Sequence, residues 1–473
     1  MRASLHGRFR HQVDFLRQQF LQEGRLPFTE ILSAGCFIQV LEKIELCRND
    51  CIYTPLVTLW VFLGQVLSAD PSCRAAVARL LAHRVGQGLE ACSSETGASC
   101  QARKRLPEQF FSAVARLAGR KLDAHADARW LWKGRRVYLF DGSTVAMPDT
   151  PENRAAYPLL YNQRPGTAFP IARIGAIISL SCGAILHLGI CRYAGKGQGE
   201  VSLLRQLWDI LSPGDVLLTD CLLSNWTTVV MLKRRGVETV SRLNKAVRGA
   251  DFRRGIRLGK DDHLVRWFKP TSIRSVDRAT YRSLPALITI RETRIRVAQP
   301  GFRTRSIVVV TTLLDPEQTT KADLATLYRA RWNNELDLRS IKITLQMDML
   351  RCKTPGLVRK EIWTHVLAYN LIRTVMAQAA AREGVPPRSL SFKATLQVLE
   401  AFRPLIAYRA DRGADHRAAL YEQLLRAIAV HRVADRPDRF EPRMAKRRPK
   451  RYDRLTRPRA EIKLRMLKRV SEI

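Results

Sequence analysis

The order of β-type and helical segments between residues 135 and 243 constrains the fold more than any other feature of the chain. Three β-type runs come first, and Ser181-Cys182-Gly183 between the second and third is a hairpin signal. Two compact β-type runs follow, each after a segment with helical spacing. The runs are RRVYLFD (135–141), IARIGAIISL (171–180), AILHLGICRY (184–193), DVLLTD (215–220) and VETVSRL (237–243). The order β-β-β-α-β-α-β predicts an α/β fold.

Helical and β-rich segments flank this region and suggest how the chain is divided. Apolar residues recur at spacings of three and four before residue 125, and again in two long helices expected from Lys321 to about Met349 and from about Val358 to Glu383. The predicted parts are a helical N-terminal region (1–125), an α/β core (130–245 and 316–390), a β-rich insertion (246–315) and a basic C-terminal region (391–473).

The charge of the chain points to a polyanionic partner. Lys and Arg number 80 against 43 Asp and Glu, which gives a formal net charge of +37. Nucleic acid is the leading candidate for such a partner. The last 40 residues hold 15 Lys or Arg against 6 Asp or Glu. We interpret them as a tail that contacts a polyanion, with a merely solubilising tail as the alternative.

Several common classes of site and compartment are not indicated. The 10 cysteines contain no CxxC pair, so we expect a reducing cytoplasm and no structural zinc. The longest apolar run, Pro55 to Leu67, is shorter than the ~20 residues that cross a bilayer, so we expect a buried helix there and no membrane partner. Because no G-x-G-x-x-G or Walker sequence occurs, we expect no nucleotide cofactor.

Two aspartates end β-type runs. Asp141 closes RRVYLFD and Asp220 closes DVLLTD. A carboxylate at the end of a strand projects from a rigid edge and can hold a cation. An Asp in such a position is more often the first residue of a turn, so each aspartate alone is weak evidence.

A polar stripe on the first long helix is more specific. Tyr328, Arg331, Glu335 and Lys342 fall within an arc of about 60° if the helix turns by about 100° per residue. Leu327, Leu338 and Leu345 lie on one side of the stripe, and Trp332, Leu336 and Ile343 lie on the other; Arg329, Asn333, Asp337 and Ser340 form a second polar face assigned to solvent. Two apolar margins favour a stripe that faces a site, where Glu335 would be a costly buried charge unless it held a metal or an ion pair. The alternative is a solvated stripe of charge pairs.

Four segments in the same order resemble DDE transposases of bacterial insertion sequences. The spacing Y-x2-R-x3-E-x6-K is the signature of one branch of that family, and Tyr328 to Lys342 match it without a gap. DGSTVAMPDTPENRAAYP (141–158), GDVLLTD (214–220) and MLRCKTPGLVRKEIW (349–363) resemble the other segments of the branch, and the likeness covers about residues 25–385. It implies a ribonuclease H-like mixed sheet with a β insertion before the glutamate helix.

The resemblance also implies a chemistry. Three carboxylates, Asp141, Asp220 and Glu335, would hold two divalent ions that cleave a phosphodiester. Hard oxygen ligands suit Mg²⁺, and Mn²⁺ should substitute. Water would free a 3′-hydroxyl at the end of the element, and that hydroxyl would attack target DNA. Tyr328, Arg331 and Lys342 would grip phosphates, or alternatively position Glu335 through ion pairs.

The same resemblance predicts the partners and leaves two functional alternatives. We expect double-stranded DNA as the partner, both terminal inverted repeats and target, and a homodimer that pairs two ends, with the helices of the C-terminal region (391–473) as its contact. From their position and charge, the helices of the N-terminal region (1–125) are expected to read the repeats. A metal-dependent nuclease that cuts without joining would use the same carboxylates. An inactive DNA-binding relative is the other functional alternative. Trp267 could stack on a flipped base, although a core tryptophan is the commoner outcome.

Overall fold

A computed structural model describes residues 2–22, 26–45, 51–246, 248–273, 276–296, 306–408, 413–433 and 453–471. Of the basic tail predicted from residue 434, residues 434–452 and 472–473 lie outside the described part. None of the described helices is both long enough and apolar enough to cross a bilayer.

The described strands form one nine-stranded sheet in the order β3-β2-β1-β4-β5-β9-β8-β7-β6. The first five are β1 (Val137–Ala146), β2 (Ile171–Ser179), β3 (Ile185–Arg192), β4 (Val216–Thr219) and β5 (Glu238–Arg242). β1, β2 and β3 pair antiparallel, whereas β4 is parallel to both β1 and β5. This arrangement is the mixed sheet of a ribonuclease H-like core, so the predicted α/β fold class is confirmed.

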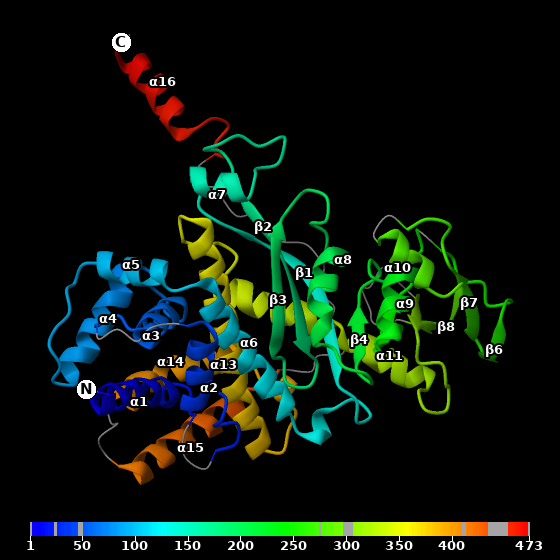
Figure 1. Cartoon of the computed structure of the whole chain (residues 1–473), viewed down its shortest axis with the longest axis horizontal. Coiled ribbons are helices and arrows are strands. Elements are labelled where there is room, and N and C mark those ends of the chain that lie inside the picture. The colour runs from blue at the N-terminus through cyan, green and yellow to red at the C-terminus, as the bar shows by residue number, and fades with distance from the viewer. Residues whose placement is uncertain are drawn as a thin grey trace.

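Burial explains why these segments are strands. The first four residues of β1 and all four residues of β4 are buried, as expected for strands that are covered on both faces. The connections to the parallel strands carry α8 (Glu200–Leu207) and α9 (Trp226–Arg234). Helix α8 packs on β1, β2 and β3. Helices α6 (Glu108–Ala124) and α13 (Pro355–Arg382) pack against β3 and against each other (Figure 1).

Helix α13 joins the parts of the chain into one hydrophobic core. It packs against α6, against helix α3 of the N-terminal region, and against α14 and α15 of the C-terminal region. Gly119 is required for the close approach of α6 to β3, because a Cβ there would lie 2.1 Å from the Ile185 carbonyl oxygen. Asn370 of α13 donates to that same oxygen. The remaining helices of these regions are α1 (Arg2–Gln18), α2 (Ala34–Lys43), α3 (Pro55–Val66), α4 (Cys73–Gly86), α5 (Gly97–Arg105), α14 (Phe392–Tyr408), α15 (Ala414–Val430) and α16 (Arg459–Ser471).

The β-rich segment after β5 extends the same sheet. β9 (Ser306–Thr311) pairs with β5, followed outward by β8 (Leu287–Arg296), β7 (Asp262–Phe268) and β6 (Ile256–Gly259), with α10 (Arg278–Ser283) alongside. These strands and α9 enclose a second hydrophobic core that contains Trp226 and Trp267. Trp267 is only 3% exposed and its indole donates to Glu292. The hypothesis that Trp267 stacks on a flipped base is therefore wrong, and the core alternative holds.

The helix predicted from Lys321 to about Met349 is shorter and is divided. It consists of α11 (Lys321–Ala330), α12 (Trp332–Arg339) and a π-helical turn (Ser340–Thr344). Arg331 separates α11 from α12 but keeps right-handed helical dihedrals (φ −54°, ψ −31°), so the polar stripe is not disrupted at this point. The chain then returns to the sheet, where Leu350 donates to the carbonyl oxygen of Ala146 at the end of β1.

Candidate functional site

The parallel strands β1 and β4 place Asp141 and Asp220 side by side. Leu139 pairs with Leu218, and each aspartate lies two residues further along its strand direction. Asp220 follows the last residue of β4, as predicted. Asp141 does not end its strand, because β1 continues to Ala146 in uninterrupted pairing with β2. The prediction that Asp141 closes a strand is therefore wrong. Asp141 lies in the middle of β1, close to the level at which the parallel strand β4 ends.

The carboxyl group of Asp141 is held in a site that disfavours its charge. Its side chain is 22% exposed. Burial, together with the negative charges of Asp220 and Glu200, raises the pKa of Asp141 to about 6, against the opposing effects of a hydrogen bond from Gly142 and of the Arg331 guanidinium. The hydrogen bond joins the Gly142 backbone N–H to Oδ1 of Asp141 at 2.8 Å. Burial is the largest of these effects, so the site disfavours the charged form of this carboxyl group.

Arg331 links the signature helix to this edge of the sheet. Its Nη2 lies 3.1 Å from Oε1 of Glu335, and its Nη1 lies 3.8 Å from Oδ2 of Asp141. Helix α12 accordingly packs on β1. The Glu335 side chain is 40% exposed. Glu335 is therefore only partly buried and forms an ion pair, one of the two arrangements that the sequence left open for it, and the desolvated carboxylate of the site is Asp141.

Tyr328 and Lys342 complete the stripe at the same edge. Nζ of Lys342 donates to Oγ of Ser143, two residues beyond Asp141 on β1, at 3.0 Å. Burial raises the pKa of the Tyr328 hydroxyl to about 12, with further contributions from Asp220 and Cys221 and opposing ones from Arg331 and Arg242. Tyr328 is therefore a neutral hydroxyl near Asp220. The residues that the sequence singled out on one helix face contact or approach the two aspartates.

The margins of the stripe differ from the prediction. Leu327, Leu338 and Leu345 are buried, but Trp332, Leu336 and Ile343 are 50%, 39% and 58% exposed. Only one apolar margin is packed.

The second polar face of the helix lies in solvent only in part: Arg329 is exposed, but Asp337 is fully buried. Asp337 pairs with Arg373 of α13, and both of its oxygens accept from Nη1 of Arg388 at 2.7 Å. Arg388 in turn donates to the carbonyl oxygens of Ser179 and Leu180, between β2 and β3. The prediction failed because the partners of Asp337 lie 36 and 51 residues away in the sequence, and nothing near Asp337 reveals them.

Two residues of the site were missed by the sequence reasoning. Glu200 is the first residue of α8, and its Oε1 lies 3.3 Å from Nη1 of Arg173 on β2. Burial and the charge of Asp220 raise the pKa of Glu200, and Arg173 opposes that shift. A glycine-rich stretch precedes Glu200 (195–199), so no strand-end pattern marks it. Its place near Asp141 follows only from the packing of α8 on β1.

The donor set fits a hard divalent cation in its chemistry. Asp141, Asp220 and Glu335 offer carboxylate oxygens, the ligands that Mg²⁺ prefers. The raised pKa of the largely buried Asp141 shows a negative charge that a bound cation would compensate. In the geometry of the described residues, no three Asp, Glu, His or Cys side chains are arranged to hold one metal ion. Glu335 is instead directed to Arg331.

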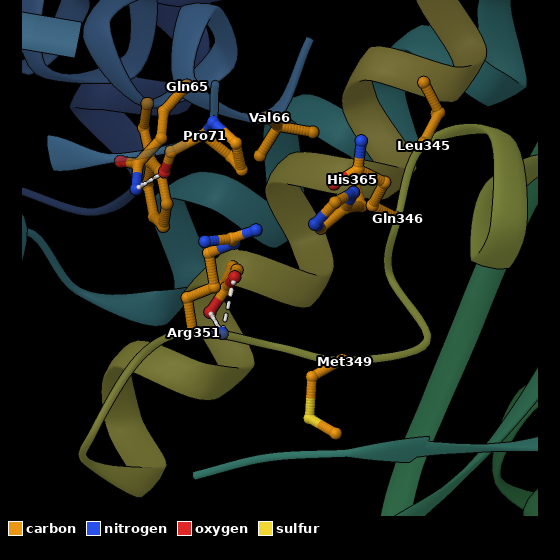
Figure 2. Close-up of a pocket in the computed structure, with 10 residues that line it drawn as sticks. Gln65, Val66, Pro71, Leu345, Gln346, Met349, Arg351 and His365 are labelled. Atoms are coloured by element: carbon orange, nitrogen blue, oxygen red, sulfur yellow. Dashed lines mark hydrogen bonds between the residues drawn. The ribbon is translucent and has the colours of Figure 1, made fainter. Parts of the chain in front are cut away.

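A separate pocket of about 310 Å³, which includes space open to solvent, lies where α3 meets the segment after the signature helix. Its lining includes Gln65 of α3, Gln346 and His365 (Figure 2). Glu361, which also lines the pocket, accepts a hydrogen bond from the Arg351 backbone N–H. Burial lowers the pKa of His365 to about 3, so this imidazole is neutral. The candidate acidic residues do not line this pocket.

Comparisons with known proteins find similarity over the part of the chain that contains the candidate site. Residues 132–371 match the model of the family described as Transposase DDE domain, a range that contains all six candidate residues. The chain is 28% identical over 362 residues to the transposase InsG for insertion sequence element IS4 of Escherichia coli (strain K12), which covers 74% of this chain and 76% of that protein. The cryo-EM structure of the piggyBac transposase synaptic complex with hairpin DNA aligns with a TM-score of 0.43 at 8% identity, over 87% of this chain and 84% of the other.

Proposed function

Because the chain belongs to the transposase DDE-domain family and is a DDE transposase of an insertion sequence, we propose that it moves that element by a cut-and-paste reaction. It would hydrolyse the phosphodiester at each end of the element and then join the freed 3′-hydroxyl to target DNA. The observation that carries the proposal has two parts: Arg331 contacts both Asp141 and Glu335, and the parallel register of β1 and β4 places Asp220 beside Asp141.

The three carboxylates are the proposed metal ligands. Asp141 and Asp220 would hold Mg²⁺ from the rigid edge of the sheet, and Glu335 would complete the set from α12, with Mn²⁺ as a substitute. Bound divalent ions supply an activated water, a stabilised leaving oxygen and charge neutralisation at phosphorus. Because Asp141 lies on β1 and Asp220 directly follows β4, the pairing of these two strands fixes their relative positions, whereas Glu335 on α12 would have to leave Arg331 to reach the cation.

The cationic residues of the stripe are proposed to bind the DNA strand end. Arg331 can donate two hydrogen bonds to a phosphate from its planar guanidinium, whereas Lys342 acts as a point charge beside Ser143. The Tyr328 hydroxyl keeps its proton at neutral pH and can donate a hydrogen bond to a phosphate oxygen. When Arg331 engages phosphate, it would release Glu335.

The partners follow from charge and family. A net charge of +37 suits double-stranded DNA, both the terminal inverted repeats and the target. We assign the reading of the repeats to the N-terminal helices and propose a homodimer that pairs the two ends. The enzyme would act in the bacterial cytoplasm, associated with the nucleoid when bound to DNA.

A joining assay tests the proposal. The purified protein is incubated with Mg²⁺, DNA that carries the ends of its own element, and a supercoiled target. Asp220→Asn is the inactive variant, and Asp209→Asn, at a side chain that is 75% exposed, is the matched control. Joined products from the native chain and the control, but not from Asp220→Asn, support the proposal. Cutting without joining favours the nuclease alternative, and salt-sensitive binding alone favours an inactive relative.

A further inference from the structure

The first residue of α8 brings a fourth carboxylate to the proposed metal site. The Glu200 side chain is 20% exposed. Its charge raises the pKa of Asp141, and the charge of Asp220 raises the pKa of Glu200 in turn. Glu200 is therefore within electrostatic reach of both aspartates, although it comes from a helix that the transposase signature does not include.

Gly142 provides the space that Glu200 occupies. A Cβ at position 142 would lie 2.5 Å from both Cγ and Oε1 of Glu200 and 2.6 Å from its Cδ, distances at which the side chain would have to move. Glu200 therefore rests directly on the backbone of β1, one residue from Asp141. The glycine after the first aspartate has a definite role here, since any other residue would displace this carboxylate from the edge of the sheet.

The charges around these carboxylates are unequal. Arg331 contacts Asp141 and Glu335, and Arg173 contacts Glu200. Arg173 is itself held on β2, where its Nη2 donates to the Tyr193 carbonyl oxygen and its guanidinium lies 4.9 Å from the centre of the Tyr193 ring. Within the described residues, no Lys or Arg forms an ion pair with Asp220. A cation at Asp141 and Asp220 would correct this imbalance, and Glu200 is positioned to share it.

We propose that Glu200 is a fourth acidic ligand of the metal site, supplying a carboxylate oxygen to the divalent cation that Asp141 and Asp220 hold. The inference rests on the proposed function. Arg173 would hold the Glu200 side chain in place while the site is metal-free. The competing role for Glu200 is purely structural, as an acidic first residue that favours the α8 N-terminus and pairs with Arg173.

Mn²⁺ binding distinguishes the two roles without any measurement of activity. The free Mn²⁺ signal is titrated by electron paramagnetic resonance against the full-length protein without DNA. Glu200→Gln is expected to weaken binding about tenfold or more. The matched control is Glu152→Gln, the same change in the first turn of α7 (Pro151–Ala156), where the residue is exposed, and it should bind as the native chain does. Native affinity in Glu200→Gln would overturn the inference.

Asp220→Asn separates failure of this inference from failure of the proposed function. If Asp220→Asn loses Mn²⁺ affinity and Glu200→Gln does not, only the role of Glu200 is refuted. If both variants bind as the native chain does, the proposed metal site itself is refuted. If circular dichroism shows that Glu200→Gln does not fold, Glu200→Asp is tested in its place, because it keeps the charge but shortens the side chain by one methylene. That variant should bind Mn²⁺ at least about threefold more weakly, and unchanged binding would refute the inference.

Discussion

Replacing Asp141 by Asn should stabilise the metal-free protein while it removes activity. The pKa of Asp141 rises from 3.8 to about 6 in the folded protein, mainly through burial. At about 1.36 kcal/mol per pKa unit, the charged carboxylate destabilises the folded state by about 3 kcal/mol. Because the raised pKa means that the folded state retains a proton that the unfolded chain releases, stability falls as pH rises from about 4 to about 6, and the full cost is present above that window.

Urea unfolding in EDTA, followed by far-UV circular dichroism, measures this effect. At pH 7.5, Asp141→Asn should increase the free energy of unfolding by about 2–3 kcal/mol, and at pH 4 the variant and the native chain should differ little. The control Asp209→Asn changes an aspartate whose side chain is 75% exposed, and it should be neutral at both pH values. Equal or lower stability of Asp141→Asn at pH 7.5 would refute the reasoning that this carboxylate is held in an unfavourable site.

Three further predictions follow from single contacts. Asp337→Ala removes the buried carboxylate that pairs with Arg373 and Arg388, and it should lower the free energy of unfolding by about 3–5 kcal/mol in the same urea assay. A loss below about 1 kcal/mol would contradict the buried ion pairs. Gly119→Ala forces a Cβ against a backbone oxygen and should lower the melting temperature, whereas Gly97→Ala, with nothing within 4 Å, should not. Lys342→Met should reduce cleavage of the element end at least about tenfold. DNA affinity in a gel shift should weaken modestly, and the slope of the logarithm of the binding constant against the logarithm of salt concentration should fall by about 1. Cleavage at the native rate by this variant would rule out a phosphate contact at the reacting strand.

The sequence predicts the sheet well because its signals are local. The hairpin at residues 181–183 and the compact run 215–220 are both found as predicted, since each is marked by residues within its own segment. The extent of β1 was underestimated because GSTVA after Asp141 contains turn-forming residues, and only its pairing with β2 makes it a strand. The conformation of that segment is decided by a partner some 30 residues away.

The candidate site was predicted in part for the same reason. The stripe from Tyr328 to Lys342 depends on helical spacing alone, and helical dihedrals at Arg331 preserve that spacing across the break. Which side of the helix is buried depends on α13, which the spacing does not reveal, so Asp337 was assigned to solvent although it is fully buried. Glu200 could not be found at all, because the packing of α8 on β1 brings it to the site.

Cleavage by a Glu335→Gln variant tests the central claim most directly. Labelled DNA carrying one element end is incubated with the native chain or the variant in Mg²⁺, and binding and cutting are read from the same samples on native and denaturing gels. If the three carboxylates act together, the native chain should cut in Mg²⁺ and not in EDTA. Glu335→Gln should bind the DNA end equally well but should not cut it. Normal cutting by Glu335→Gln would contradict the assignment of the site.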